Sequence, residues 1–285
     1  MYNAAIKVGN LILVHGCRPS VGTSTLAAMT ASFLAFNGEK TLLLTTDADA
    51  PFDAVSMLSS DIADDHMDEL VVLENSNGLT ENNLDDYIST LTNNLGYLRA
   101  STKLSRLTKD PARTVQRIVD TAMYSYRYVI VDIGYDYTNY ADVLLKKSDL
   151  VLHVLGQDPK GLARAQEIYA RGGFGENTFM VPVVADFIDD ATADVKSIGK
   201  QLQIDTLFTL DHDADIYKAV QSRDVAGFVQ KNTKKKTGFL SSLMGKKRSK
   251  NSADDDSYID ELGQLISQIT QALTSEEVDS DDGNR

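Results

Sequence analysis

The sequence predicts an α/β fold, with a doubly wound, mostly parallel sheet and helices on both of its faces. Over the first two thirds of the chain, short runs of leucine and β-branched residues alternate with helical segments of about ten to fifteen residues, which is the pattern of βαβ units. These runs are apolar at successive positions, as expected for strands that are buried on both faces. A basic linker and a C-terminal helix follow this domain.

The individual elements are predicted from these runs and from the helical spacing between them. We expect strands at residues 11–14, 41–46, 70–73, 95–98, 128–132, 150–155, 178–185 and 207–210. We expect helices at residues 25–36, 84–91, 111–124 and 161–170. Gly38 is placed to end the first helix. Ligands of such sheets bind outside the carboxyl ends of the strands, so the site is expected where the loops after the first, second and fifth of these runs meet.

Composition limits the compartment and the partners. The chain has 285 residues, of which 42% are hydrophobic, enough for one large core or two modest ones. It has neither a spanning run of about eighteen apolar residues nor a signal peptide, so we expect a cytoplasmic protein. Cys17 is the only cysteine, which excludes an intramolecular disulfide and a cysteine-based zinc cluster. The net charge of −13 disfavours DNA as a partner.

The chain divides into four predicted parts. Residues 1–228 form the α/β domain, 229–253 a basic linker with a short amphipathic insert, 254–274 an amphipathic helix and 275–285 an acidic tail. The helix is predicted from apolar residues at steps of three and four, and it either docks on the domain or binds a partner. The interval 231–250 contains eight basic residues and no acidic one.

The segment HGCRPSVGTST, residues 15–25, stands between the first strand and the first helix. A phosphate-binding loop occupies this place in many nucleotide-binding proteins, because successive backbone N–H groups and the helix N-terminus face an anion. A lysine usually reaches the outer phosphates, and a Ser or Thr hydroxyl binds magnesium. Here the final glycine, Gly22, and the hydroxyls of Ser24 and Thr25 are present, whereas Thr23 stands where the lysine is expected.

The loop resembles that of the ParA/MinD superfamily of ATPases, whose pattern is Gly-Lys-Gly-Gly-Val-Gly-Lys-Thr-Thr. Val21, Gly22 and Thr25 match this pattern, and Arg18 takes the place of the signature lysine that reaches the phosphates of a dimer partner. Pro19 and Ser20 replace two glycines, which removes one backbone donor and stiffens the turn. The resemblance implies an ATP- and Mg²⁺-binding loop made of Cys17, Arg18, Pro19, Ser20, Val21, Gly22, Thr23, Ser24 and Thr25.

Acidic residues after later strands fit the same resemblance. Asp47 and Asp49 follow the second strand, where the family places the carboxylate that orients the attacking water. Asp132 ends a run of four apolar residues, and such a buried charge needs a partner such as hydrated magnesium or the Ser24 hydroxyl. The resemblance therefore implies Asp47, Asp49 and Arg18 as catalytic residues, and Ser24 and Asp132 as the metal site. Within the superfamily, the loop without lysine is most similar to the TadZ/CpaE branch of pilus-assembly localisation factors.

Several functions are compatible with these features. The preferred hypothesis is an ATP-binding homodimer that organises a cell-envelope, secretion or pilus machine, with weak or absent hydrolysis because the loop lysine is missing. The alternatives are a nucleotide-free scaffold and a partition-type ATPase that moves DNA or a plasmid. The basic segment 231–250 carries Phe239, Leu240, Leu243 and Met244 on one face of a short helix, which suits peripheral binding at the inner face of the cell membrane. A nucleic acid or an acidic protein is an equal alternative for this segment.

Overall fold

The computed structural model describes most of the chain. It covers residues 9–46, 53–62, 67–135, 139–171, 174, 179–191, 193–243 and 258–282, and of these the side chains at 139–140, 235–243 and 275–282 are outside the description. None of the helices in these ranges combines the length and the hydrophobicity that crossing a membrane requires.

An eight-stranded sheet runs through this part of the chain, in the order β3-β4-β2-β5-β1-β6-β7-β8. Its strands are β1 (Asn10–Gly16), β2 (Thr41–Thr45), β3 (Ser89–Thr92), β4 (Leu95–Leu98), β5 (Tyr128–Asp132), β6 (Leu150–Leu155), β7 (Phe179–Phe187) and β8 (Phe208–Asp211). The edge strand β3 pairs antiparallel with β4, and the other neighbours are parallel. The predicted doubly wound, mostly parallel sheet is therefore confirmed.

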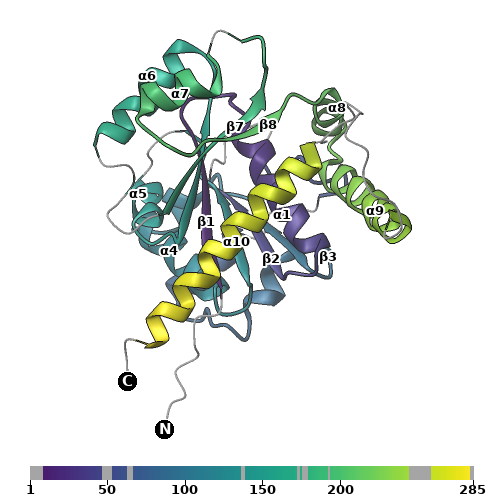
Figure 1. Ribbon diagram of the computed structural model, residues 1–285. Coiled ribbons are helices and arrows are strands. Elements are labelled where there is room, and N and C mark those ends of the chain that lie inside the picture. The colour runs from purple at the N-terminus through teal and green to yellow at the C-terminus, as the bar shows by residue number, and fades with distance from the viewer. Residues whose placement is uncertain are drawn as a thin grey trace.

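Helices cover both faces of the sheet. They are α1 (Thr23–Phe36), α2 (Met67–Asn75), α3 (Leu104–Leu107), α4 (Pro111–Ala122), α5 (Asn139–Leu145), α6 (Pro159–Ala170), α7 (Val195–Leu202), α8 (Ala214–Ser222), α9 (Val225–Leu243) and α10 (Tyr258–Asp282), with a 3₁₀ turn at Leu84–Tyr87. Helices α1, α9 and α10 pack together on one side, and α2, α4 and α5 pack on the other (Figure 1). Each side contains a hydrophobic core, and the side chains of β1 alternate between the two. Ile12 belongs to the core on the side of α1, and Leu11 belongs to the core on the side of α4.

Two short predictions within the domain are wrong. The apolar run 70–73 is part of α2 rather than a strand, since a run of this length does not by itself distinguish a helix from a strand. Asp68 and Glu69 in the first turn favour the helix. The helix expected at 84–91 is a single 3₁₀ turn followed by β3, because pairing with β4 overrides the helical spacing of this segment.

The C-terminal region is more helical than predicted. The linker expected at 229–253 is helical as far as Leu243, since it continues α9 without a proline to end it. Helix α10 continues to Asp282 and includes most of the expected acidic tail. Figure 1 shows α9 extending away from the sheet, while α10 crosses in front of the sheet.

The amphipathic face predicted for the basic segment stays a prediction. The side chains of Phe239, Leu240 and Leu243 are outside the description, and Met244 lies outside the described residues altogether. The same holds for the part of the predicted linker from 244 to 253. The membrane-binding role of this segment therefore rests on its sequence alone.

The apolar stripe of α10 docks on the domain. All seven residues of the predicted stripe are buried, namely Tyr258, Ile259, Leu262, Leu265, Ile266, Ile269 and Leu273. A polar contact also fixes the helix, because the Glu261 carboxylate accepts a hydrogen bond of 2.8 Å from the Asp211 amide at the end of β8. This helix is therefore part of the core rather than a free partner-binding element.

Replacing Leu265 with alanine is expected to lower the free energy of unfolding by about 2–5 kcal/mol, since its side chain is fully buried. Chemical denaturation measures this change. The exposed neighbour Gln264 is the control, and Gln264→Ala should change stability by less than about 0.5 kcal/mol. Equal stability of the two variants would contradict the docking of α10.

Candidate functional site

The loop that follows β1 is anchored between two parallel strands. The Gly16 amide donates to the Gly134 carbonyl just after β5, and the Cys17 amide donates to the Val154 carbonyl on β6, both at 2.8 Å. Strand β1 lies between β5 and β6, so the loop leaves the sheet where ligands of doubly wound folds bind. The structure therefore places this loop where the sequence predicts a phosphate-binding site.

The backbone of the loop has the geometry of an anion cradle. Ser20 and Gly22 adopt positive φ angles of 58° and 94°, and alternation of this kind turns successive amides toward one point. No backbone N–H group of residues 20–25 has an acceptor anywhere in the described chain, and the N-terminus of α1 has no side-chain cap. Since backbone donors are nearly always paired in folded proteins, this set of open amides fits phosphate oxygens.

Thr23 occupies the position of the missing lysine without reaching outward. Its side chain is buried, and a Cβ added at Gly16 would collide with its hydroxyl oxygen. Gly16 must therefore remain glycine for Thr23 to pack at the base of the loop. Thr23 therefore contributes no positive charge at the position where the family pattern has a lysine.

Arg18 is paired within its own chain. Its Nε donates to the Asp158 carboxylate at 2.6 Å, and its Nη1 donates to the Pro19 carbonyl at 2.7 Å. Asp158 also caps α6 by accepting from the Gly161 amide at 2.9 Å. Partial burial raises the pKa of Asp158, but the Gly161 amide and Arg18 outweigh it and lower the pKa overall. These two contacts, through Nε and Nη1, direct the Arg18 side chain toward its own α6.

Cys17 is a packed, unreactive thiol. It is fully buried beside Gly161, and burial raises its pKa. A raised pKa keeps the sulfur protonated and a poor nucleophile. Its role is to fill space where the family pattern has a glycine.

The two residues of the predicted metal site lie together. Asp132, at the end of β5, is 4% exposed, and its carboxylate accepts hydrogen bonds from the Ser24 hydroxyl and the Ala54 amide. It also accepts from the Gly134 amide at 3.1 Å. Burial raises the pKa of Asp132 to about 6, although these hydrogen bonds lower it, and the nearby Asp53 raises it further. A divalent cation fits this pair, because a buried carboxylate is stabilised by a metal and a hydroxyl is a common Mg²⁺ ligand.

Asp53 and Arg99 complete this side of the site, and neither is among the residues predicted from the sequence. The Asp53 carboxylate is buried and accepts from Arg99 Nη2 at 2.8 Å and from the Ser56 amide at 2.7 Å. Arg99 directly follows β4. A charge after a buried strand is a usable signal, as it is for Asp132, but the partner of Arg99 lies 46 positions away in the sequence.

The predicted catalytic residues are only partly placed. Asp47 and Asp49 lie outside the described residues, so their roles stay predictions. Asp53, the first described residue after these positions, lies near the Asp132 carboxylate. Ser24 of the loop forms a hydrogen bond with Asp132, and the roles of these two residues and of the loop 17–25 in binding stay predictions.

The buried Asp132 carboxylate makes stability depend on pH. Its pKa in the folded protein is about 6, whereas the ordinary value is 3.8. Between these two pH values the carboxyl group is protonated in the folded state and ionised in the unfolded state. Stability from this group is present below pH 3.8 and is lost as the pH rises through about 6. Asp132→Asn removes this loss, so relative to the parent the variant should gain about 2–3 kcal/mol across that interval.

Denaturation with urea at several pH values measures the effect. Asp190→Asn, which removes an exposed carboxylate, controls for the loss of one charge. A stability difference between the parent and Asp132→Asn that is the same at every pH would contradict the raised pKa of Asp132.

Comparisons with known proteins agree with this geometry. No protein-family model matches the sequence, and neither does any curated protein sequence. Among solved structures, a ParA family ATPase from Chlorobium tepidum is similar at 15% identity and a TM-score of 0.67, over 78% of this chain and 91% of that chain.

Two further structures hold nucleotides. The septum site-determining protein MinD from Pyrococcus horikoshii, complexed with Mg-ADP, is similar at 13% identity and a TM-score of 0.66, over 93% of this chain and 98% of that one. A putative plasmid partition protein from Borrelia burgdorferi, bound to AMPPNP, is similar at 15% identity and a TM-score of 0.56, over 93% of this chain and 99% of that one. This chain therefore has the P-loop fold of the ParA/MinD ATPases.

Proposed function

We propose that the protein binds ATP with Mg²⁺, dimerises face to face, and serves as a spatial organiser of a cell-envelope machine, in the manner of the TadZ/CpaE branch. The observation that carries this proposal is the set of open amides at residues 20–25 beside the Ser24–Asp132 pair. The AMPPNP and Mg-ADP complexes of similar folds support the choice of ligand.

Each part of the site has a distinct task in this proposal. The open amides bind phosphate oxygens, and Ser24 with Asp132 holds the cation. Bound Mg²⁺ supplies positive charge that offsets both the phosphates and the buried carboxylate. Arg99 holds Asp53, which positions the end of the acidic segment that contains Asp47 and Asp49.

ATP acts here as a conformational ligand rather than as a fuel. A ligand that contacts both subunits stabilises the dimer and shifts the population toward it. Hydrolysis is weak or absent, because Thr23 brings no positive charge to the departing phosphate. The dimer would present two copies of the basic segment 231–250, and two weak membrane contacts give more avidity than one.

A nucleotide-free scaffold is the second candidate. The Arg18–Asp158 ion pair favours it, since the cation that should reach a partner's phosphates is satisfied within its own chain. The two functions differ in what Mg-ATP does to the oligomeric state. Partition of DNA is disfavoured by the net charge of −13.

Sedimentation velocity with and without Mg-ATP tests the proposal. Mg-ATP should convert the parent from monomer to dimer, and Arg18→Ala should weaken this dimer about tenfold, since a guanidinium–phosphate contact is lost. Asp158→Ala is the matched control, because it breaks the same ion pair but leaves Arg18 in place, and it should still dimerise.

Two results would contradict the proposal. A parent that stays monomeric at millimolar Mg-ATP leaves only the scaffold. Equal loss of the dimer in Arg18→Ala and Asp158→Ala would show that Arg18 supports the dimer only through its ion pair with Asp158, and not by contacting the phosphates of the other subunit.

Thr23→Lys should restore the missing cation and raise ATP turnover by about tenfold or more, since positive charge on the departing phosphate is a main source of catalysis. Phosphate release measures the rate. Thr23→Met, which has a similar length and no charge, is the control and should remain near the parent. A rate that rises equally in both variants would indicate relief of packing rather than electrostatic catalysis.

A further inference from the structure

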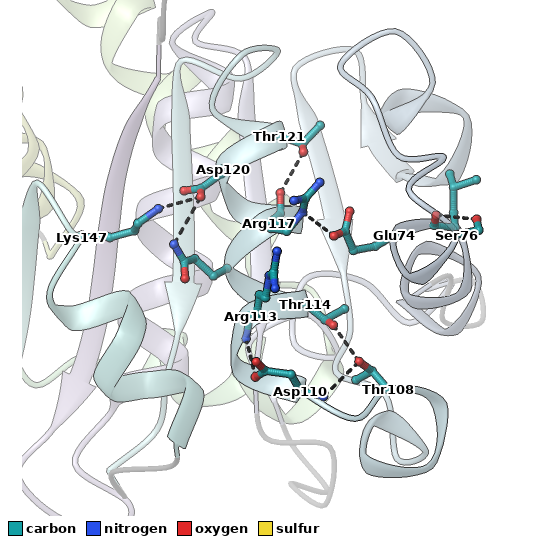
Figure 2. Close-up of polar contacts among 12 residues, drawn as sticks. Glu74, Ser76, Thr108, Asp110, Arg113, Thr114, Arg117, Asp120, Thr121 and Lys147 are labelled. Carbon is teal, nitrogen blue, oxygen red and sulfur yellow. Dashed lines mark hydrogen bonds and ion pairs between the residues drawn. The ribbon is translucent and has the colours of Figure 1, made fainter.

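A polar cleft lies between α2 and α4, apart from the nucleotide site. Its volume is about 470 Å³, and it shares no residue with the loop 17–25 or with Asp53, Arg99 and Asp132. The charged residues that line it are Glu74, Lys109, Asp110, Arg113 and Arg117. Figure 2 shows Arg113 and Arg117 on α4, on the side of this helix near Glu74.

The cations of this cleft are incompletely paired. Arg117 forms an ion pair with the buried Glu74. The exposed side chains of Lys109 and Arg113 have no carboxylate partner among the residues that the structure describes. Exposed cations without an ion pair also occur elsewhere in the described chain, as at Lys200, but Lys109 and Arg113 lie together in the lining of a cleft.

The position of Arg113 is unfavourable for the helix itself. It lies in the first turn of α4, which contains no acidic residue, and a cation there opposes the helix dipole. It also stands four residues before Arg117, where like charges repel. Helix stability therefore does not explain the cation at this position, which lines the cleft.

The helix end does not itself provide the site. The Asp110 carboxylate already caps α4 by accepting from the Arg113 amide at 3.1 Å. The charge available to a ligand comes from the side chains of Lys109 and Arg113, with Arg117 behind them, and it is partly offset by Asp110 and Glu74. A ligand must therefore place its negative groups at the cations and avoid the two carboxylates.

The walls of the cleft are held in place by hydrogen bonds. The hydroxyls of Thr108 and Thr114, both buried, lie 2.9 Å apart (Figure 2). The Asn75 side-chain amide donates to the Leu107 carbonyl at 2.7 Å and joins the end of α2 to the segment before α4. A cleft with fixed walls loses little conformational entropy when a ligand binds.

We propose that this cleft binds an acidic peptide segment of a partner protein, with Lys109 and Arg113 pairing with its carboxylates. A peptide suits the charge pattern, because it can set carboxylates at the cations and neutral residues opposite Asp110 and Glu74. A nucleic acid strand suits it less, because its phosphates recur at every nucleotide and would meet both carboxylates. This inference is independent of nucleotide binding.

Fluorescence anisotropy with a labelled peptide of alternating glutamate and serine tests the proposal on the full chain at low ionic strength. Arg113→Glu and Lys109→Glu should each weaken binding about tenfold. Lys200→Glu, an equal change of charge at an exposed site on α7, should change it by less than about twofold. Arg113→Glu should also raise the unfolding temperature, because it removes repulsion and places an acid in the first turn. Loss of binding together with a gain of stability excludes misfolding as the cause.

Hydrogen exchange locates the bound peptide. Protection at residues 107–117 supports the proposal, whereas protection only at 231–243 means that the peptide binds the lysines of α9 and overturns it. Equal affinity of the parent and Arg113→Glu would also overturn it. So would a DNA duplex that binds more tightly than the peptide and loses affinity in Arg113→Glu.

Discussion

Two backbone hydrogen bonds determine where the site lies, those by which Gly16 and Cys17 attach the end of β1 to its two neighbours. They continue the hydrogen bonding of the sheet as far as Cys17, and the loop begins immediately after this residue. The amides from residue 20 to residue 25 then have no acceptors within the described chain. This arrangement does not require a lysine, so the loop keeps the shape of a phosphate site although one of its usual charges is absent.

The electrostatics of the site favour a cation that the protein does not supply. Thr23 is neutral and Arg18 is paired with Asp158, so neither of these two residues brings an unpaired positive charge to the loop. Asp132 has a buried carboxylate without a positive counterion among the described residues, and burial raises its pKa because it disfavours the charged form. A nucleotide with its divalent cation corrects both, since the phosphates find donors and the carboxylate finds a counterion.

Much of the fold follows from the sequence because the signals are local. Strand β6 has the predicted bounds, and the Asp-Pro pairs at 110–111 and 158–159 mark the starts of α4 and α6 by their capping chemistry. The run 70–73 is ambiguous in the sequence, because four apolar residues fit either a strand or a helix. The length of α9 could not be predicted for a different reason. Its C-terminal part is recognisable in the sequence only by its basic composition, which indicates charge but not backbone conformation. The site is predictable where one segment contains the signal, as in the loop and at the end of β5. It is not predictable where two distant segments meet, as Arg18 and Asp158 do across 140 positions.

A crystal structure of the protein grown with AMPPNP and Mg²⁺ is the decisive measurement for nucleotide binding. It should show phosphate oxygens within hydrogen-bonding distance of the amides of residues 20–25, and Mg²⁺ beside Ser24 and Asp132. A loop without nucleotide at saturating AMPPNP would contradict this assignment of the site. Nucleotide bound elsewhere on the protein would contradict it equally.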